Sequence, residues 1–133
     1  MKLLLIGFGT VGQGLAELLI EKKNTLEKEY GLKTRVVGIA DMLKGSIYDA
    51  GGLDLQKALE KVKSGGKLSD LAEAFDDDAL AMIKQAKADM MVEATYTDIK
   101  TGEPATSHIR AALEKGMHVT TTNKGPAALF LQE

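Results

Sequence analysis

Three glycines near the start of the chain have the spacing of a phosphate-binding turn. The stretch IGFGTVG places Gly7, Gly9 and Gly12 at G-x-G-x-x-G intervals, directly after the apolar run Leu3–Ile6. In such a turn the first glycine permits a tight bend, the second leaves room for a pyrophosphate, and the third lets the next helix pack closely. This position, between a buried-looking strand and a helical pattern, favours a dinucleotide site over a glycine-rich turn that binds nothing.

The residues that follow the glycines would supply groups that bind an anion. Thr10 and Val11 begin the predicted helix. The first N–H groups of a helix have no partner within it, and the positive end of the helix dipole lies there. We therefore expect the pyrophosphate at this point.

Asp41 is a candidate for recognition of the adenosine ribose. It closes the predicted strand Arg35–Ala40, where a carboxylate can accept hydrogen bonds from both ribose hydroxyls. The alternative is an aspartate that only forms a turn. A carboxylate disfavours the 2′-phosphate of NADP, but Lys44 or Lys57 could pair with that phosphate. The cofactor is therefore NAD or NADP, with NAD favoured.

Lys124 and two threonines are candidates for the reactive end of the cofactor. Lys124 lies in the predicted loop 122–126 after the last strand, where an ammonium could hold a substrate oxygen or relay a proton. The alternative is a solvated surface lysine. Thr95 and Thr97 follow another strand and could contact the nicotinamide ribose or carboxamide, or simply bond their own backbone.

Other polar residues carry weaker indications. Glu93 lies inside a buried-looking strand, so it needs a partner or must point to an edge. His108 and His118 have no neighbours at metal-ligand spacing, which favours structural roles and no metal site. Glu103 precedes a predicted helix, where its charge suits the helix dipole.

The elements that would position these residues alternate between strands and helices. This alternation predicts an α/β fold of the Rossmann type, a doubly wound parallel sheet with the strand order second, first, third, fourth. The strand ends would then gather the residues 7–12, 95–97 and 122–124 at one edge. The expected strands are Leu3–Ile6, Arg35–Ala40, Met90–Ala94 and His118–Thr121; the expected helices are Thr10–Tyr30, Leu55–Lys63, Asp76–Lys87 and Pro104–Lys115; Met42–Leu53 is expected to be a loop over the adenosine end.

The composition indicates one globular domain of 133 residues. The chain is 44% hydrophobic and has 17 basic and 19 acidic residues, interspersed, which gives no basic stripe for nucleic acid. It has no membrane-length apolar run and no room for a cleavable signal, so we expect a cytoplasmic protein. The absence of cysteine excludes disulfides, thiol nucleophiles and Cys-ligated zinc but is neutral about the compartment. The chain stops at 130–133 in a helical pattern without a stop signal, which predicts a truncated chain and an incomplete sheet.

Several segments, in order, resemble homoserine dehydrogenase. They are IGFGTVGQG, VVGIAD followed by KGSIYDAGGLD, VEATYTDIKTGEPA, and HIRAALEKGMHVTTTNKGP. The resemblance extends from Met1 to about Phe130, and VEAT and TNKGP are far more specific than the glycine pattern. It implies an oxidoreductase that interconverts L-homoserine and L-aspartate 4-semialdehyde with NAD or NADP, on the route to threonine, methionine and isoleucine.

The resemblance also implies roles for single residues. Asp41 would face the adenosine ribose, Thr95, Asn123 and Lys124 would line the nicotinamide side, and Lys124 would lie close to the reacting carbon. The residues implied to hold the pyrophosphate are Gly7, Phe8, Gly9, Thr10, Val11 and Gly12.

Members of the family continue into a second domain, which dimerises, binds the substrate and supplies another lysine and an aspartate. The resemblance therefore implies that residues 1–133 are the dinucleotide-binding domain of a homodimer and are inactive alone. Two alternatives stay open at this point. One is a stand-alone NAD(H)-sensing regulatory module; the other is part of a different semialdehyde or amino-acid dehydrogenase.

Overall fold

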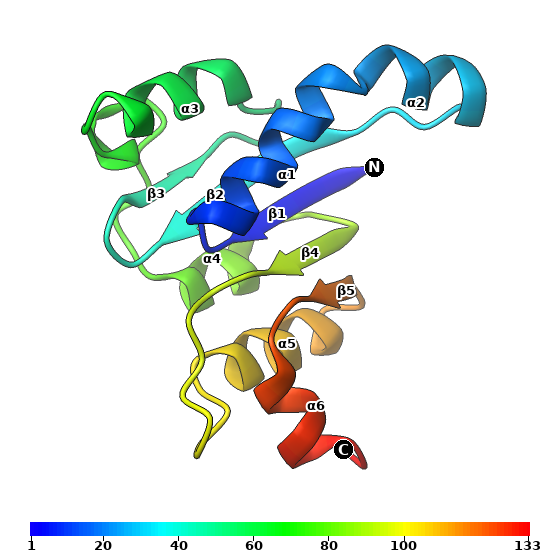
Figure 1. The fold of residues 1–133 in the computed structure, drawn as a ribbon, viewed down its shortest axis with the longest axis vertical. Helices are drawn as coiled ribbons and strands as arrows, with labels where there is room; N and C mark the ends of the chain where they lie inside the picture. Colours follow the sequence, from blue (N-terminus) through cyan, green and yellow to red (C-terminus); the bar gives the residue numbers. More distant parts are fainter.

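A five-stranded sheet forms the centre of the molecule, in the order β3-β2-β1-β4-β5 (Figure 1). A computed structural model describes all residues from 1 to 133. Four strands are parallel and follow the predicted order, which confirms the α/β fold. The strands are β1 (Lys2–Ile6), β2 (Arg35–Asp41), β3 (Gly45–Tyr48), β4 (Met90–Glu93) and β5 (His118–Thr121).

The prediction of a loop over residues 42–53 was wrong, because this segment contains β3. The strand pairs antiparallel with β2, from Gly38 opposite Tyr48 to Asp41 opposite Gly45. Only two of its four residues are buried, so it has no apolar run to mark it in the sequence. Its outer side is covered, since the N–H of Tyr48 donates to the carbonyl of Glu73.

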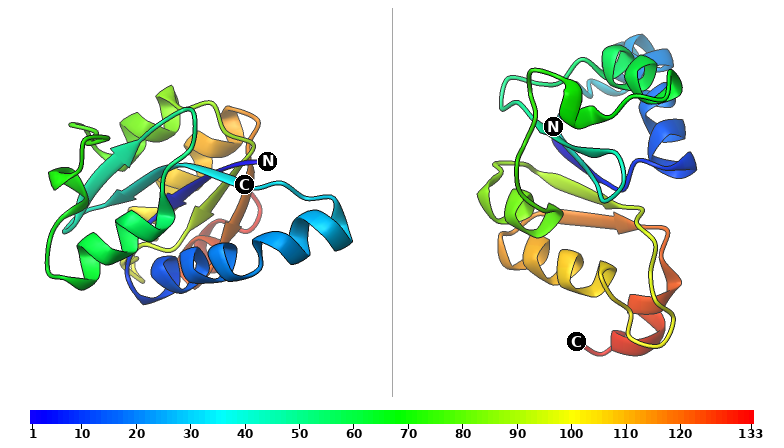
Figure 2. Two further views of the ribbon diagram at one scale, coloured as in Figure 1. Left: turned by 90° about the horizontal axis from the view of Figure 1, so that it is seen from above. Right: turned by 90° about the vertical axis from the view of Figure 1, so that its left-hand side faces the viewer.

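Helices cover both faces of the sheet (Figure 2). Leu3 and Leu5 of β1 pack on the side of α1 and α3, while Leu4 and Ile6 pack on the side of α4 and α5. Because successive side chains of a strand point to opposite faces, this double covering explains why β1 is apolar at nearly every position. The helices are α1 (Thr10–Glu21), α2 (Lys23–Tyr30), α3 (Leu55–Lys63), α4 (Ala79–Gln85), α5 (Ala105–Glu114) and α6 (Lys124–Phe130), with a 3₁₀ turn at Leu68–Asp70.

The long helix expected over Thr10–Tyr30 is two helices, because the backbone leaves the helical conformation at Lys22. Its second half, α2, has no buried residue and extends past the sheet (Figure 1). Gly31 ends α2 in the left-handed conformation, with φ +63°.

The carboxyl-terminal part of the chain departs from the predicted loop at 122–126. Lys124 is the first residue of α6, and Asn123 is its N-cap. Pro126 lies in the first turn of the helix, where its missing N–H is not needed. Lys124 is therefore held at the start of a helix rather than inside a loop. None of the helices has the combination of length and apolarity that crossing a membrane requires.

Candidate functional site

The turn after β1 has the geometry that the glycine pattern predicts. Gly7 has φ +96°, a conformation that favours glycine, and a Cβ there would lie 2.5 Å from the carbonyl oxygen of Ala94. A Cβ at Gly12 would lie 2.3 Å from the carbonyl oxygen of Gly7, so α1 packs closely on the turn. A Cβ at Gly9 would meet no atom within 4 Å. The space in front of Gly9 is therefore open, as the close approach of a diphosphate requires.

The amino end of α1 is available to an anion. Gly9 is the N-cap, no side chain caps the helix, and its first turn holds no acidic residue. Thr10 and Val11 are exposed at this end, and their N–H groups precede the first intrahelical hydrogen bonds. Phe8 is different, because its side chain is fully buried and its N–H donates to a carboxylate within the protein.

That carboxylate is Asp41, which connects the end of β2 to the glycine turn. Oδ2 accepts the N–H of Phe8 at 2.8 Å, and Oδ1 accepts those of Leu43 at 3.0 Å and Lys44 at 2.9 Å. Burial raises the pKa of the Asp41 carboxyl, but these three donors and the Lys44 charge hold the pKa below its usual value. The aspartate forms a turn, and Oδ2 still has capacity for a ribose hydroxyl.

The two lysines considered for a 2′-phosphate lie in different places. Lys44 follows Asp41 by three residues, and its ammonium is close enough to lower the pKa of that carboxyl. Lys57 lies in the first turn of α3, and this helix begins where the N–H of Leu53 donates to Val36, near the amino end of β2. Asp41 is at the opposite end of the strand, so this arrangement favours Lys44 over Lys57 as the partner of a 2′-phosphate.

A buried carboxylate, Glu93, organises the edge of the sheet beyond β4. The residue is fully buried. Oε1 accepts the N–H of Thr95 at 2.7 Å, the hydroxyl of Thr95, and Nδ2 of Asn123 at 3.1 Å. Oε2 lies 2.7 Å from Nδ1 of His108, on α5. Three segments distant in the sequence therefore meet at one side chain.

The structure brings two of the predicted nicotinamide residues together and separates a third. Thr95 and Asn123 share Glu93, and Thr95 is also next to the glycine turn, since a Cβ at Gly7 would lie 2.8 Å from its backbone nitrogen. Thr97 instead packs beneath α6, where a Cβ at Gly125 would lie 2.9 Å from its methyl group. The buried hydroxyl of Thr97 has no hydrogen-bond partner.

Lys124 is adjacent to Asn123 at the start of α6. It is exposed and takes part in none of the four ion pairs of the structure. Its ammonium is therefore available to a ligand at the same edge. The structure has no group of three or more His, Asp or Glu side chains that could hold a metal ion.

Glu93 and His108 are the residues whose relation the sequence did not reveal. A glutamate in a buried strand signalled the need for a partner, but the partner is 15 residues away on another element. The structural interpretation of His108 is confirmed, since it is buried and bonded to Glu93. Glu103 accepts the N–H of Ser107 at the start of α5, as its predicted dipole role requires.

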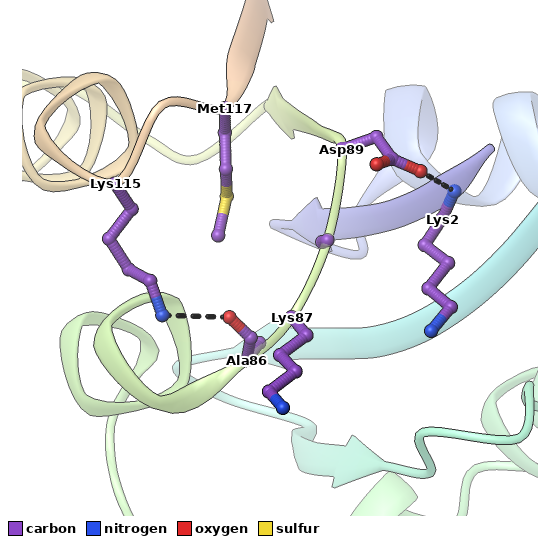
Figure 3. A pocket seen from close by; sticks show the side chains of 7 residues that line it. Lys2, Ala86, Lys87, Asp89, Lys115 and Met117 are labelled. Carbon is purple, nitrogen blue, oxygen red and sulfur yellow. Dashed lines mark hydrogen bonds between the residues drawn. The ribbon is translucent and has the colours of Figure 1, made fainter.

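Two hollows lie at the amino ends of the strands, away from the residues above. One, of about 340 Å³, is lined by Lys2, Asp89 and Lys115 among others (Figure 3). There Lys115 Nζ donates to the carbonyls of Lys84 and Ala86 at the end of α4, which is a favourable place for a cation. The other, of about 770 Å³, borders Arg35 and α3. Both lie at the edge opposite the glycine turn, so the candidate site does not include them.

Comparison with known proteins agrees with this geometry. Residues 7–131 match the family model described as "Homoserine dehydrogenase, NAD binding domain". An NAD(+)-dependent homoserine dehydrogenase of Pseudomonas canavaninivorans is 44% identical over 96% of this chain and 37% of its own length. A homoserine dehydrogenase of Methanocaldococcus jannaschii is 39% identical over 100% of this chain and 39% of its own length.

A solved structure shows the same arrangement. A protein of Archaeoglobus fulgidus, assigned as a homoserine dehydrogenase, superposes with a TM-score of 0.76 and 36% identity, over 96% of this chain and 35% of that one. The chain thus spans little more than a third of the length of these relatives. The alternative of a stand-alone regulatory module finds no support among them. The chain belongs to the family of homoserine dehydrogenase NAD-binding domains.

Proposed function

We propose that this chain is the cofactor-binding part of an enzyme that interconverts L-homoserine and L-aspartate 4-semialdehyde. A nicotinamide cofactor would donate a hydride to the C4 carbonyl carbon of the semialdehyde in one direction, and in the reverse direction its oxidised form would accept a hydride from C4 of homoserine. The remaining domain of a cytoplasmic homodimer would bind the substrate. The observation that carries this proposal is the placement of an open glycine turn, Asp41, Asn123 and Lys124 along the carboxyl ends of parallel strands.

Different residues would bind different parts of the cofactor. Gly9 and the N–H groups of Thr10 and Val11 would hold the diphosphate, and Asp41 would accept a hydroxyl of the adenosine ribose. Asn123 would face the nicotinamide half. These roles are supported by the open space at Gly9 and by the free acceptor capacity of Asp41 Oδ2.

Lys124 would act on the substrate rather than on the cofactor alone. Its ammonium is exposed at the start of α6 and unpaired by any carboxylate. A positive charge there would stabilise the oxygen that gains negative charge as the carbonyl is reduced, or pass it a proton. The neighbouring residue, Asn123, donates to Glu93, so Lys124 lies at the same edge of the sheet as Glu93.

Titration of the chain with NADH and NADPH, followed by nicotinamide fluorescence, tests the proposal directly. We expect saturable binding of NADH and weaker binding of NADPH, because the fixed carboxylate of Asp41 repels a 2′-phosphate. Lys44 can offset part of that repulsion, so its replacement by alanine should weaken NADPH binding more than NADH binding. Failure of both dinucleotides to bind would exclude the proposed role of this edge.

A further inference from the structure

The burial of Glu93 requires an explanation beyond the fold. A carboxylate removed from water is costly unless every acceptor position is matched by a donor. Glu93 has zero exposure, and its four contacts come from Thr95, Asn123 and His108. Two of these three residues belong to the proposed cofactor edge. The carboxylate is therefore placed to control what that edge presents to a ligand.

The contact with Glu93 fixes the orientation of the Asn123 side chain. A carboxylate can only accept, so the amide nitrogen of Asn123 must face Oε1, at 3.1 Å. The amide oxygen then faces away from Glu93. Asn123 is also the N-cap of α6, yet its side chain makes no capping hydrogen bond. An asparagine at this position commonly caps its helix, and here it is turned toward Glu93 instead.

The same carboxylate orients Thr95. Both its N–H and its hydroxyl donate to Oε1. A hydroxyl whose hydrogen is committed in this way offers only its lone pairs to other groups. Glu93 thus converts two side chains that can donate or accept into acceptors.

A pair of acceptors suits a ligand group that donates. The carboxamide of the nicotinamide ring carries two such donors, its N–H bonds. We propose that Glu93 is a positioning residue that presents Asn123 Oδ1 and Thr95 Oγ1 as acceptors to these donors, with His108 fixing its second oxygen. This inference rests on the proposed cofactor site and specifies how its nicotinamide half is recognised.

The variant Glu93→Gln tests this role at constant shape. A neutral amide oxygen accepts hydrogen bonds more weakly than a carboxylate oxygen, so of the three contacts on Oε1 we expect the longest, from Asn123, to be lost and those from Thr95 to remain. We expect the affinity for NADH to fall about 3- to 10-fold, the range of one lost hydrogen bond, with no change in the affinity for ADP-ribose, which lacks nicotinamide. Glu60→Gln, the same change on the exposed side of α3, is the matched control and should leave both affinities unchanged.

Two variants of Asn123, which is only half-buried, test the inference from the other side of the contact. Asn123→Ala should weaken NADH binding to a similar extent, and adding Glu93→Gln should cause no further loss, because that change acts by releasing Asn123 and leaves the contacts of Thr95 in place. Asn123→Asp keeps an outward oxygen but places two carboxylates in contact, so it should bind NADH more weakly than Asn123→Ala.

The outcomes separate this inference from the function on which it rests. Equal weakening of NADH and ADP-ribose by Glu93→Gln, unchanged NADH binding, additive losses in the double variant, or normal NADH binding by Asn123→Asp would each overturn the role of Glu93 while leaving the cofactor site in place. Absence of NADH and ADP-ribose binding by the unaltered chain would instead refute the proposed function, and this inference with it.

Discussion

The carboxyl ends of the strands form one edge of the sheet, and the two halves of this edge present different kinds of chemical group. The half formed by β1, α1 and β2 presents backbone groups, and a single carboxylate, Asp41, joins its strands. The half formed by β4, α5 and β5 presents side chains gathered on a buried carboxylate, Glu93. Backbone groups are the same for every residue, so the first half depends on where side chains are absent. The second half depends on the identity of each side chain.

Gly7 lies where the two halves touch, so its replacement should have the largest effect. In Gly7→Ala the new Cβ would lie 2.5 Å from Ala94 O and 2.8 Å from Thr95 N, at a φ of +96°. Since neither backbone can move without disturbing β1 or β4, we expect a loss of about 3 kcal/mol or more in the free energy of unfolding. Urea unfolding measures it. A loss below about 1 kcal/mol would mean that the halves are not in rigid contact.

Lys124 tests whether the side-chain half carries the chemistry. In the whole protein we expect Lys124→Ala to lower kcat about 100-fold or more, the cost of removing one group that stabilises developing charge. The affinity for NADH should change far less, because the backbone half holds the diphosphate. Steady-state kinetics and fluorescence titration measure the two quantities. Equal losses in turnover and cofactor affinity would contradict a role in the chemical step.

Gly9 separates ligand binding from stability within the backbone half. Because a Cβ at Gly9 meets no protein atom within 4 Å, the free energy of unfolding of Gly9→Ala should lie within about 1 kcal/mol of that of the unaltered chain. The methyl group would occupy the space proposed for the diphosphate, so both NADH and ADP-ribose should bind about 10-fold more weakly. Gly7→Ala is the contrasting variant. Unchanged binding of ADP-ribose would place the diphosphate elsewhere.

The same contrast explains what the sequence could predict. The glycine turn, the first strand and the closing position of Asp41 follow from spacing and hydrophobicity within short segments, and the structure confirms these positions. The strand β3 escaped prediction because half of its four residues are only partly buried and its partner lies across a turn. Spacing and hydrophobicity are local features of a sequence, whereas β3 forms because it pairs with β2.

The side-chain half was harder to predict for a related reason. His108 and Asn123, which contact Glu93, lie 15 and 30 residues after it in the sequence. No spacing rule links these three residues. The structure also places Lys124 at the start of α6, whereas the sequence predicted a loop there. The positions of Thr95 and Asn123 at one edge were predicted, but the carboxylate that holds them together required the three-dimensional structure.

Asp41 gives the smallest effect and the one that depends on pH. Its pKa is lowered in the folded chain, so its ionised form stabilises the fold above the ordinary aspartate pKa, and this contribution disappears as the pH falls through the lowered value. Asp41→Asn should therefore cost about 1 kcal/mol of unfolding free energy at pH 7, and the difference from the unaltered chain should shrink below about pH 4. Urea unfolding at several pH values measures the difference. A deficit that stays constant down to pH ~2.5 would mean that the carboxylate charge contributes nothing, and that the backbone half is joined by the shape of the turn alone.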